Sequence, residues 1–339
     1  MCVPVRNEEA LLPQLLDAIA AQVEVPGVAV TLCLLLDACE DRSAEIATRF
    51  AATVPVRVRI AARNATGQPN AGRARRAAMR LGQAAMRGCR TAALLTTDAD
   101  SRPARDWIAA ACRSLAECDL VAGRIVRDAD DTSPGQDRLE AYYDRLYALR
   151  RHHDPLAWEP APGHHQVGGA NLAFRAAAYR ALGGFAPVPA GEDGAIVDAA
   201  ERLGLRVRRD RAVLVETSGR HHGRAVRGLA DHLRMLAEDA GNAAVAHPDV
   251  AAWQYRGHAL ARAIHPALGA AGAAAAARLA DALEMPIEHV LAVAAAAPNA
   301  GAFATCVVPA PPGADRLVPL HVAEAALARL ERDPYERAA

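Results

Sequence analysis

The sequence predicts an α/β fold with a mainly parallel central sheet flanked by helices. Three observations support this fold class. Short β-rich runs alternate with helix-like stretches over the first 125 residues. Polar clusters recur where the expected strands end, which is where ligands bind in such sheets. The last third of the chain is rich in alanine and mostly helix-like, so a helical C-terminal extension is expected.

The expected strands are β-rich runs, at residues 1–5, 31–36, 54–60, 92–96 and 119–126. The expected helices have apolar residues at helical spacing, at residues 8–22, 43–52, 72–86, 104–116 and 138–151. A strand–helix unit follows at 168–185, and a helix leading into a strand at 191–207. We therefore expect a first domain over residues 1–225 and a helical extension over 226–339.

Composition limits the classes of function. The chain has 339 residues, a formal net charge of +0 and no lysine, so nothing favours a nucleic-acid partner. Its seven cysteines are odd in number and form no C-x-x-C pair, which predicts a reducing, cytoplasmic location. We find no signal peptide and no apolar run long enough to cross a membrane, although contact with a membrane surface stays open.

The first two strands end in polar residues. VPVRNEE follows the first strand, where Asn7 is expected to cap a helix that has Glu8 and Glu9 in its first turn. LLLDACEDRS ends the second strand, and helix capping does not require Asp37. Its carboxylate could accept a hydrogen bond from a ribose hydroxyl or a base N–H.

Two aspartates follow the strand at 92–96, in the stretch TTDADSRP. If the strand continues through them, Asp98 and Asp100 point to the same side. Two carboxylates so close repel each other unless a cation lies between them, and Mg²⁺ and Mn²⁺ prefer oxygen ligands. The sequence thus offers a metal site here, while a plain strand end explains the same residues.

Three further clusters could take part in chemistry. NAGRARRAAMR places several arginines at the start of one helix, where they could bind phosphate or form a solvated basic face. Glu192 and Asp193 lie at a loop-to-helix junction, where one could act as a general base or both could serve the helix N-terminus. In the stretch TSGRHHGR, Arg220 and Arg224 could bind phosphate, and a histidine could serve as an extra metal ligand.

Taken in order, these motifs resemble those of the family 2 glycosyltransferases, which are inverting enzymes with a GT-A fold. The matching pieces cover roughly residues 1–225: VPVRNEE, LLLDACEDRSAEIA, NAGRARRAA, TTDADSRPARDWI, GGANLAFRAAAYRALGGF and GEDGAIVDAAERLGLRV. Each motif is weak alone, and their shared order makes the resemblance specific.

The resemblance implies a role for each matching residue. Those expected to bind the nucleotide sugar are Pro4, Val5, Arg6, Glu8, Asp37, Gly72, Arg75, Asp98, Gly169, Ala170, Asn171, Arg220 and Arg224. The expected ligands of Mn²⁺ or Mg²⁺ are Asp100 and His222. Asp193, with Glu192 beside it, is the expected general base.

The implied reaction moves one sugar from a nucleoside-diphosphate sugar, with UDP-sugars favoured over GDP-sugars, to an unidentified hydroxyl acceptor. Three features depart from the family pattern: the first strand is short, Ala38 follows Asp37 where a second aspartate is common, and the Q-x-x-R-W signature of processive members is absent. We therefore expect a single transfer and not chain elongation.

Two other functions stay open. A nucleotidyltransferase also uses a Rossmann-like sheet and paired aspartates, but it usually opens with a Gly-rich loop bearing Arg and Lys. A non-catalytic member of the same fold could bind sugar nucleotides or act as a scaffold. The alanine-rich C-terminal region could shape the acceptor site, mediate homodimerisation or touch a membrane surface.

Overall fold

The computed structural model describes residues 1–64, 69–128, 133–219, 243–268, 272–313 and 315–332. These form two compact units. The first comprises residues 1–132, 166–199 and 207–234, and the second comprises 133–165, 200–206 and 235–339. The expected boundary at residue 225 lies outside the described residues and stays a prediction.

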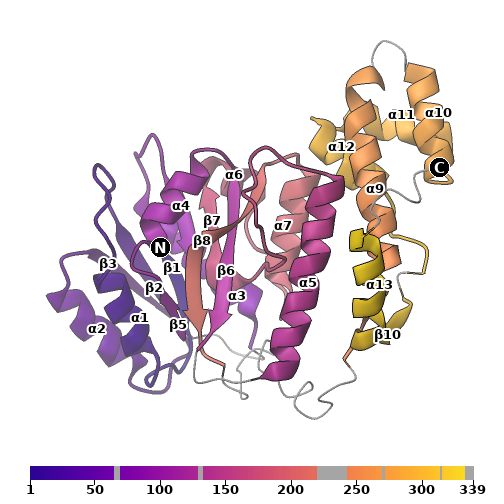
Figure 1. Ribbon diagram of the computed structural model, residues 1–339. Coiled ribbons are helices and arrows are strands. Elements are labelled where there is room, and N and C mark those ends of the chain that lie inside the picture. The colour runs from indigo at the N-terminus through magenta and orange to yellow at the C-terminus, as the bar shows by residue number, and fades with distance from the viewer. Residues whose placement is uncertain (65–68, 129–132, 220–242, 269–271, 314, 333–339) are drawn as a thin grey trace. The chain divides into compact units, whose positions relative to one another are not determined.

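The first unit is built on an eight-stranded sheet (Figure 1). Its strands are β1 (Cys2–Val5), β2 (Thr31–Asp37), β3 (Arg57–Arg63), β4 (Ala93–Thr96), β5 (Ser101–Pro103), β6 (Leu120–Arg127), β7 (Leu172–Arg175) and β8 (Val207–Thr217). They lie in the order β3-β2-β1-β4-β7-β6-β8-β5. Neighbours β3, β2, β1 and β4 are parallel, as are β6 and β8, whereas β7 and β5 run antiparallel to their neighbours. The predicted mainly parallel GT-A architecture is confirmed.

Helices pack on this sheet because each presents an apolar face to it. They are α1 (Leu12–Ala20), α2 (Ser43–Thr53), α3 (Ala71–Ala85), α4 (Trp107–Leu115) and α6 (Ala176–Ala181). A further helix, α7 (Glu192–Arg202), begins in the same unit. Helix α3 packs on β1 and β2, and α4 packs on β8. The central strands are buried almost throughout, as expected for strands covered on both faces.

The second unit is mostly helical, which confirms the helical character expected of the C-terminal region. It contains α5 (Pro134–His153), α9 (Pro248–Ile264), α10 (Gly272–Ala282), α11 (Ile287–Ala296), α12 (Ala300–Val307) and α13 (Leu320–Arg332). It also holds a two-stranded antiparallel sheet of β9 (Ala244–Ala246) and β10 (Leu317–Pro319). Two clusters of buried apolar side chains form its core. Within the described ranges, no helix combines the length and apolar character needed to cross a membrane.

Two local expectations were wrong. Asn7 does not cap α1, which begins at Leu12 with Leu11 as its N-cap. Asn7 instead has a φ of 50°, a left-handed conformation that asparagine tolerates, and its Oδ1 accepts a hydrogen bond from Glu40 N. Glu8 therefore precedes the helix, and its backbone N–H donates to Ser43 Oγ. These bonds tie the loop after β1 to the loop after β2.

The strand expected at residues 54–60 is displaced by three residues, because β3 spans Arg57–Arg63. The shift matters at its carboxyl end. In the parallel register, Arg63 lies opposite Asp37, the last residue of β2. The two side chains meet at the edge of the sheet where the polar clusters gather.

Candidate active site

The polar clusters expected at strand ends gather at the carboxyl edge of the sheet. Val5 pairs in register with Leu36, so the loop after β1 lies beside the loop after β2. Pro4 and Val5 are in β1, Arg6 follows it directly, and Asp37 ends β2. This adjacency comes from the parallel pairing of the two strands.

Asp37 is the buried carboxylate of this edge, with 3% of its surface exposed. Arg63 Nε donates to its Oδ1 at 2.8 Å, and Arg6 Nη1 lies 4.0 Å from its Oδ2. Two arginines therefore lie beside the buried carboxylate. The sequence analysis missed Arg63, because the strand carrying it was expected to end three residues earlier.

The D-x-D pair lies beyond the strand and not within it. β4 ends at Thr96, and Asp98 and Asp100 occupy the turn that leads to β5, where Ser101 N donates to Asp98 O at 3.2 Å. The argument that strand alternation aims both carboxylates to one side is therefore wrong. A turn separates them instead: Asp98 binds Arg75, and Asp100 accepts a long hydrogen bond of 3.5 Å from Ser101 Oγ.

Helix α3 begins as expected from NAGRARR, because the Asn70 side chain accepts a hydrogen bond from Arg73 N at 2.7 Å. Gly72 lies two residues into the helix, where Gly72 N donates to Val188 O at 3.0 Å. A Cβ atom at position 72 would lie 2.8 Å from Val188 O and closer still to Ala186 O. Glycine is required here so that the helix can approach the loop at residues 186–188.

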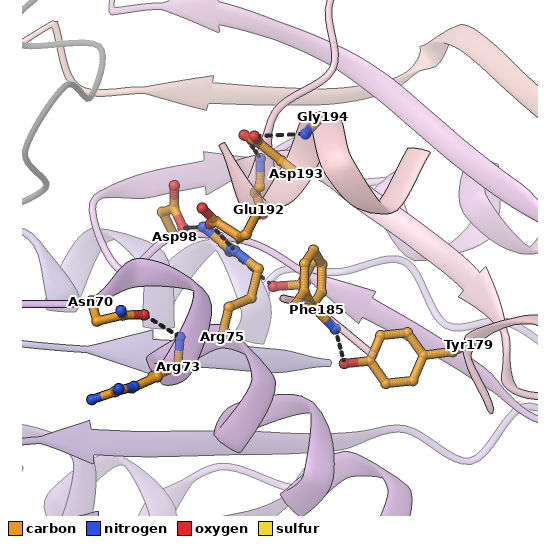
Figure 2. Close-up of polar contacts among 11 residues, drawn as sticks. Asn70, Arg73, Arg75, Asp98, Tyr179, Phe185, Glu192, Asp193 and Gly194 are labelled. Atoms are coloured by element: carbon orange, nitrogen blue, oxygen red, sulfur yellow. Dashed lines mark hydrogen bonds and ion pairs between the residues drawn. The ribbon is translucent and has the colours of Figure 1, made fainter. Parts of the chain in front are cut away.

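Arg75 is the centre of the site, and only 5% of its surface is exposed (Figure 2). Its Nη2 donates to Asp98 Oδ1 at 2.8 Å, and its Nε donates to Glu192 Oε1 at 3.1 Å. Its Nη1 donates to Gly169 O at 2.8 Å and to Thr96 Oγ1 at 3.1 Å. One guanidinium on helix α3 thus joins three other chain segments, which hold Thr96 and Asp98, Gly169, and Glu192.

Two carboxylates follow one another in the first turn of α7. Glu192 is buried and bound to Arg75, whereas Asp193 is half-buried. Asp193 Oδ2 accepts a hydrogen bond from Gly169 N at 3.0 Å, and its Oδ1 accepts one from Gly194 N at 2.8 Å. Figure 2 draws the pair side by side, with Glu192 directed to Arg75 and Asp193 to the backbone N–H groups. The two acids therefore have different environments.

The ionisation of this cluster follows from its contacts. Burial alone would lower the pKa of Arg75, but the negative charges of Asp98 and Glu192 outweigh burial and raise it. Burial raises the pKa of Glu192; Arg75 opposes that shift, and Asp193 adds to it. Two carboxylates, Asp98 and Glu192, bind this guanidinium, and a third, Asp193, directly follows Glu192.

The G-G-A-N motif forms a short 3₁₀ turn, η1 (Gly169–Asn171), at the start of β7. The Asn171 side chain is 1% exposed; its Nδ2 donates to Arg124 O and Val213 O, and its Oδ1 accepts from Trp107 Nε1 at 2.9 Å. These bonds link β6, β8 and α4 to the turn. Contacts of Gly169, Ala170 and Asn171 with a sugar stay predictions.

The expected residues Arg220, His222 and Arg224 lie outside the described residues. Elsewhere in the described chain, no three His, Cys, Asp or Glu side chains gather in a way that could hold a metal ion. Asp100 offers a carboxylate in the turn after β4. Since Mg²⁺ is often bound by only one or two carboxylates together with substrate phosphates, Asp100 fits such a site without a complete protein cage.

The first unit is an α/β fold with a mainly parallel sheet and polar residues at its carboxyl edge, and sequence comparison identifies the family. Residues 1–181 match the model described as Glycosyl transferase family 2. The chain belongs to this family and is a glycosyltransferase. No curated protein sequence matched the chain.

Several solved structures are similar in fold. One is the mannosyltransferase PcManGT from Pyrobaculum calidifontis in complex with GDP-Man and Mn²⁺, with 20% identity, a TM-score of 0.47, and coverage of 98% of this chain and 86% of that one. Another is S. aureus TarS 1-349 in complex with UDP-GlcNAc, with 14% identity, a TM-score of 0.49, and coverage of 90% and 88%. A third is glucosyl-3-phosphoglycerate synthase from Mycobacterium tuberculosis, with 17% identity, a TM-score of 0.43, and coverage of 72% and 81%.

Proposed function

We propose that this glycosyltransferase moves one sugar from a nucleoside-diphosphate sugar to a hydroxyl acceptor, with inversion at the anomeric carbon and with a divalent metal ion. The observation that carries this proposal is the convergence of Asp98 and Asp193 through Arg75 and Gly169. Asp98, proposed to contact the nucleotide, and Asp193, the candidate base, thereby belong to one hydrogen-bond network.

Asp193 is the better candidate for the base of the two acids in α7. Glu192 is buried and committed to Arg75. Asp193 is half-buried and held by two backbone N–H groups, and a carboxylate oxygen has further lone pairs that can accept a proton. It would remove the proton from the acceptor hydroxyl as that oxygen attacks the anomeric carbon. Attack from the face opposite the leaving diphosphate inverts the configuration and needs no covalent intermediate.

The donor is proposed to lie along the carboxyl edge of the sheet, as ligands do in open α/β sheets. Asp37, held by Arg63 and Arg6, would accept hydrogen bonds from the nucleoside. Asp98 would contact the nucleotide, and its second carboxylate oxygen remains for this purpose beside the one bound to Arg75. UDP-sugars are the favoured donors, with GDP-sugars second.

Asp100 would hold Mn²⁺ or Mg²⁺, and the diphosphate of the donor and water would supply the other oxygen ligands. His222 stays a second candidate ligand outside the described residues. When bound, the metal ion would neutralise negative charge that develops on the leaving diphosphate. A cation there would also reduce the repulsion among the neighbouring carboxylates of Asp98, Glu192 and Asp193.

A screen of sugar nucleotides by thermal unfolding, with and without Mn²⁺, tests the proposal. A ligand that binds only the folded state raises the melting temperature by mass action. We expect one donor class to do so in the presence of Mn²⁺, with the shift lost in Asp100→Ala. An unchanged shift in Asp100→Ala would remove the metal role. Donor binding without release of nucleoside diphosphate to any acceptor would instead indicate a non-catalytic member.

A further inference from the structure

We propose that Arg75 is a positioning residue, which fixes the Asp98 carboxylate and the Gly169 backbone that holds Asp193, and is not a ligand of the donor phosphates. This inference rests on the proposed function, because it assigns a role in that reaction to Arg75. The resemblance had implied that Arg75 binds the nucleotide sugar. The inference follows from how the guanidinium is surrounded.

All three guanidinium nitrogens of Arg75 already bind protein acceptors. Nε binds Glu192, Nη2 binds Asp98, and Nη1 binds both Thr96 Oγ1 and Gly169 O. A guanidinium has five N–H groups, and a forked grip on phosphate uses two that point the same way. Four contacts with buried or half-buried acceptors leave no free fork. The guanidinium of Arg75 is thus engaged by protein acceptors.

The network continues from Arg75 to the candidate base through one residue. Gly169 accepts a hydrogen bond from Arg75 at its carbonyl and donates one to Asp193 Oδ2 from its N–H. A Cβ atom at position 169 would lie 2.6 Å from Arg75 Nε, so the contact requires glycine. A change in the position of the guanidinium therefore shifts the Gly169 backbone, whose N–H orients the Asp193 carboxylate.

The same guanidinium sets the charge balance of the site. Without it, Asp98 and Glu192 would face each other as partly buried carboxylates with no cation between them, which is unfavourable. Arg75 therefore allows Asp98, proposed for the donor site, and Glu192, which precedes the proposed base, to lie close together. Phe185 covers the guanidinium, with Arg75 Cζ 5.8 Å from its ring centroid.

Arg75→Met tests this role, with Arg208→Met as a matched control. Arg208 is also ion-paired within the first unit, to Asp210 and Glu117. Since Arg75→Met leaves Glu192 buried without a partner and could impair folding, Arg75→Met combined with Glu192→Gln provides a second variant without that uncompensated charge. For each protein we would measure donor affinity by calorimetry with Mn²⁺, kcat and KM for the donor, and amide exchange of the peptide that includes Gly169.

A positioning role predicts that both Arg75 variants lose about 100-fold in kcat, the order of loss expected from misplaced reacting groups. Donor affinity should fall by a smaller factor than kcat, because Asp98 is the residue of the donor site that loses a partner, and exchange of the Gly169 amide should accelerate. Arg208→Met should match the wild type in all three measurements. A loss of donor affinity equal to the loss in kcat/KM, with kcat and Gly169 exchange unchanged, would overturn the proposal in favour of a phosphate ligand. Equal losses in Arg208→Met would overturn it in favour of a purely structural role.

The two proposals fail in different ways. A wild-type protein that binds the donor but releases no nucleoside diphosphate contradicts the transferase reaction. In that case Gly169 exchange and donor affinity still decide the part played by Arg75, since neither depends on turnover. Accelerated exchange with retained donor affinity in Arg75→Met would support the positioning role, and unchanged exchange would contradict it.

Discussion

Arg75 and Glu192 form a buried ion pair, with Nε of Arg75 3.1 Å from Oε1 of Glu192 and side-chain exposures of 7% and 5%. The pair joins helix α3 to the first turn of α7, across 117 positions of sequence. A buried pair of this kind contributes less to net stability than its geometry suggests, because both charges have lost their water. Its value here is the fixed relative position of two motifs.

The pH dependence of stability should report the burial of Glu192. Its pKa is raised above the ordinary value of 4.5, mainly by burial, so the folded state holds this proton to higher pH than the unfolded state. As pH rises from 4.5 to the raised pKa of Glu192, ionisation of this carboxyl therefore lowers the free energy of unfolding. We expect the free energy of unfolding of wild type, relative to Glu192→Gln, to fall across that window.

Urea unfolding at a series of pH values measures this difference. Glu45→Gln is the control, because Glu45 lies on an exposed helix face and pairs with Arg49 at i,i+4. Its difference from wild type should be small throughout. A pH-independent difference for Glu192→Gln would mean that Arg75 fully compensates the burial.

Gly72→Ala should destabilise the protein by about 1–3 kcal/mol, the usual cost of overpacking a tight contact. The added methyl group would meet the backbone of Ala186 and Val188, which cannot rotate away as a side chain can. Gly135→Ala, in helix α5, is the control, because a Cβ there meets no described atom within 4 Å. Thermal unfolding would distinguish them, and equal melting temperatures for the two variants would contradict the steric explanation.

Asp37→Asn should weaken donor binding and leave kcat nearly unchanged. The substitution removes a charge that Arg63 and Arg6 now neutralise, and it removes an acceptor proposed to bind the nucleoside. Hydrogen bonds to charged groups contribute about 1.5–3 kcal/mol, so KM for the donor should rise by roughly 10-fold to 100-fold. A fall in kcat at constant KM would place Asp37 outside the nucleoside site.

His258 should make the second unit sensitive to acid. Burial and the nearby Arg150 lower its pKa from 6.5 to about 4, so the unfolded chain binds this proton more readily than the folded one. Stability should therefore be lost as pH falls from 6.5 towards 4. His258→Gln should reduce that loss, whereas substitution of the exposed His321 should not. Identical pH profiles for wild type and His258→Gln would contradict the assignment.

The sequence predicted the sheet well where strands are uniformly apolar, as in β2 and β4, because burial on both faces leaves a continuous signal. It misplaced β3, since the alternating residues around Val58 do not mark where the strand ends, and Arg63 was missed as a result. The D-x-D pair was expected to follow strand alternation beyond residue 96, because sequence alone does not reveal where pairing stops.

The side-chain network was harder to predict than the motifs that compose it. The Gly72 and Arg75 motif, the D-x-D pair and the Glu192 pair could each be found in sequence. Their connection depends on which acceptors meet one guanidinium, and that follows from tertiary packing alone. Thr96 is the clearest example: it looked like an ordinary strand residue, yet its Oγ1 accepts a bond from Arg75.

The most direct test of the account is transfer by Asp193→Asn, measured together with donor binding by calorimetry. The asparagine Oδ1 can still accept the hydrogen bond from Gly169 N, although its NH2 group cannot accept the one that Asp193 now receives from Gly194 N, and the donor affinity should persist. Loss of the base should lower kcat by about 10²–10⁴-fold, the usual contribution of general base catalysis. Turnover close to wild type, with the donor bound normally, would contradict the assignment of Asp193 as the base.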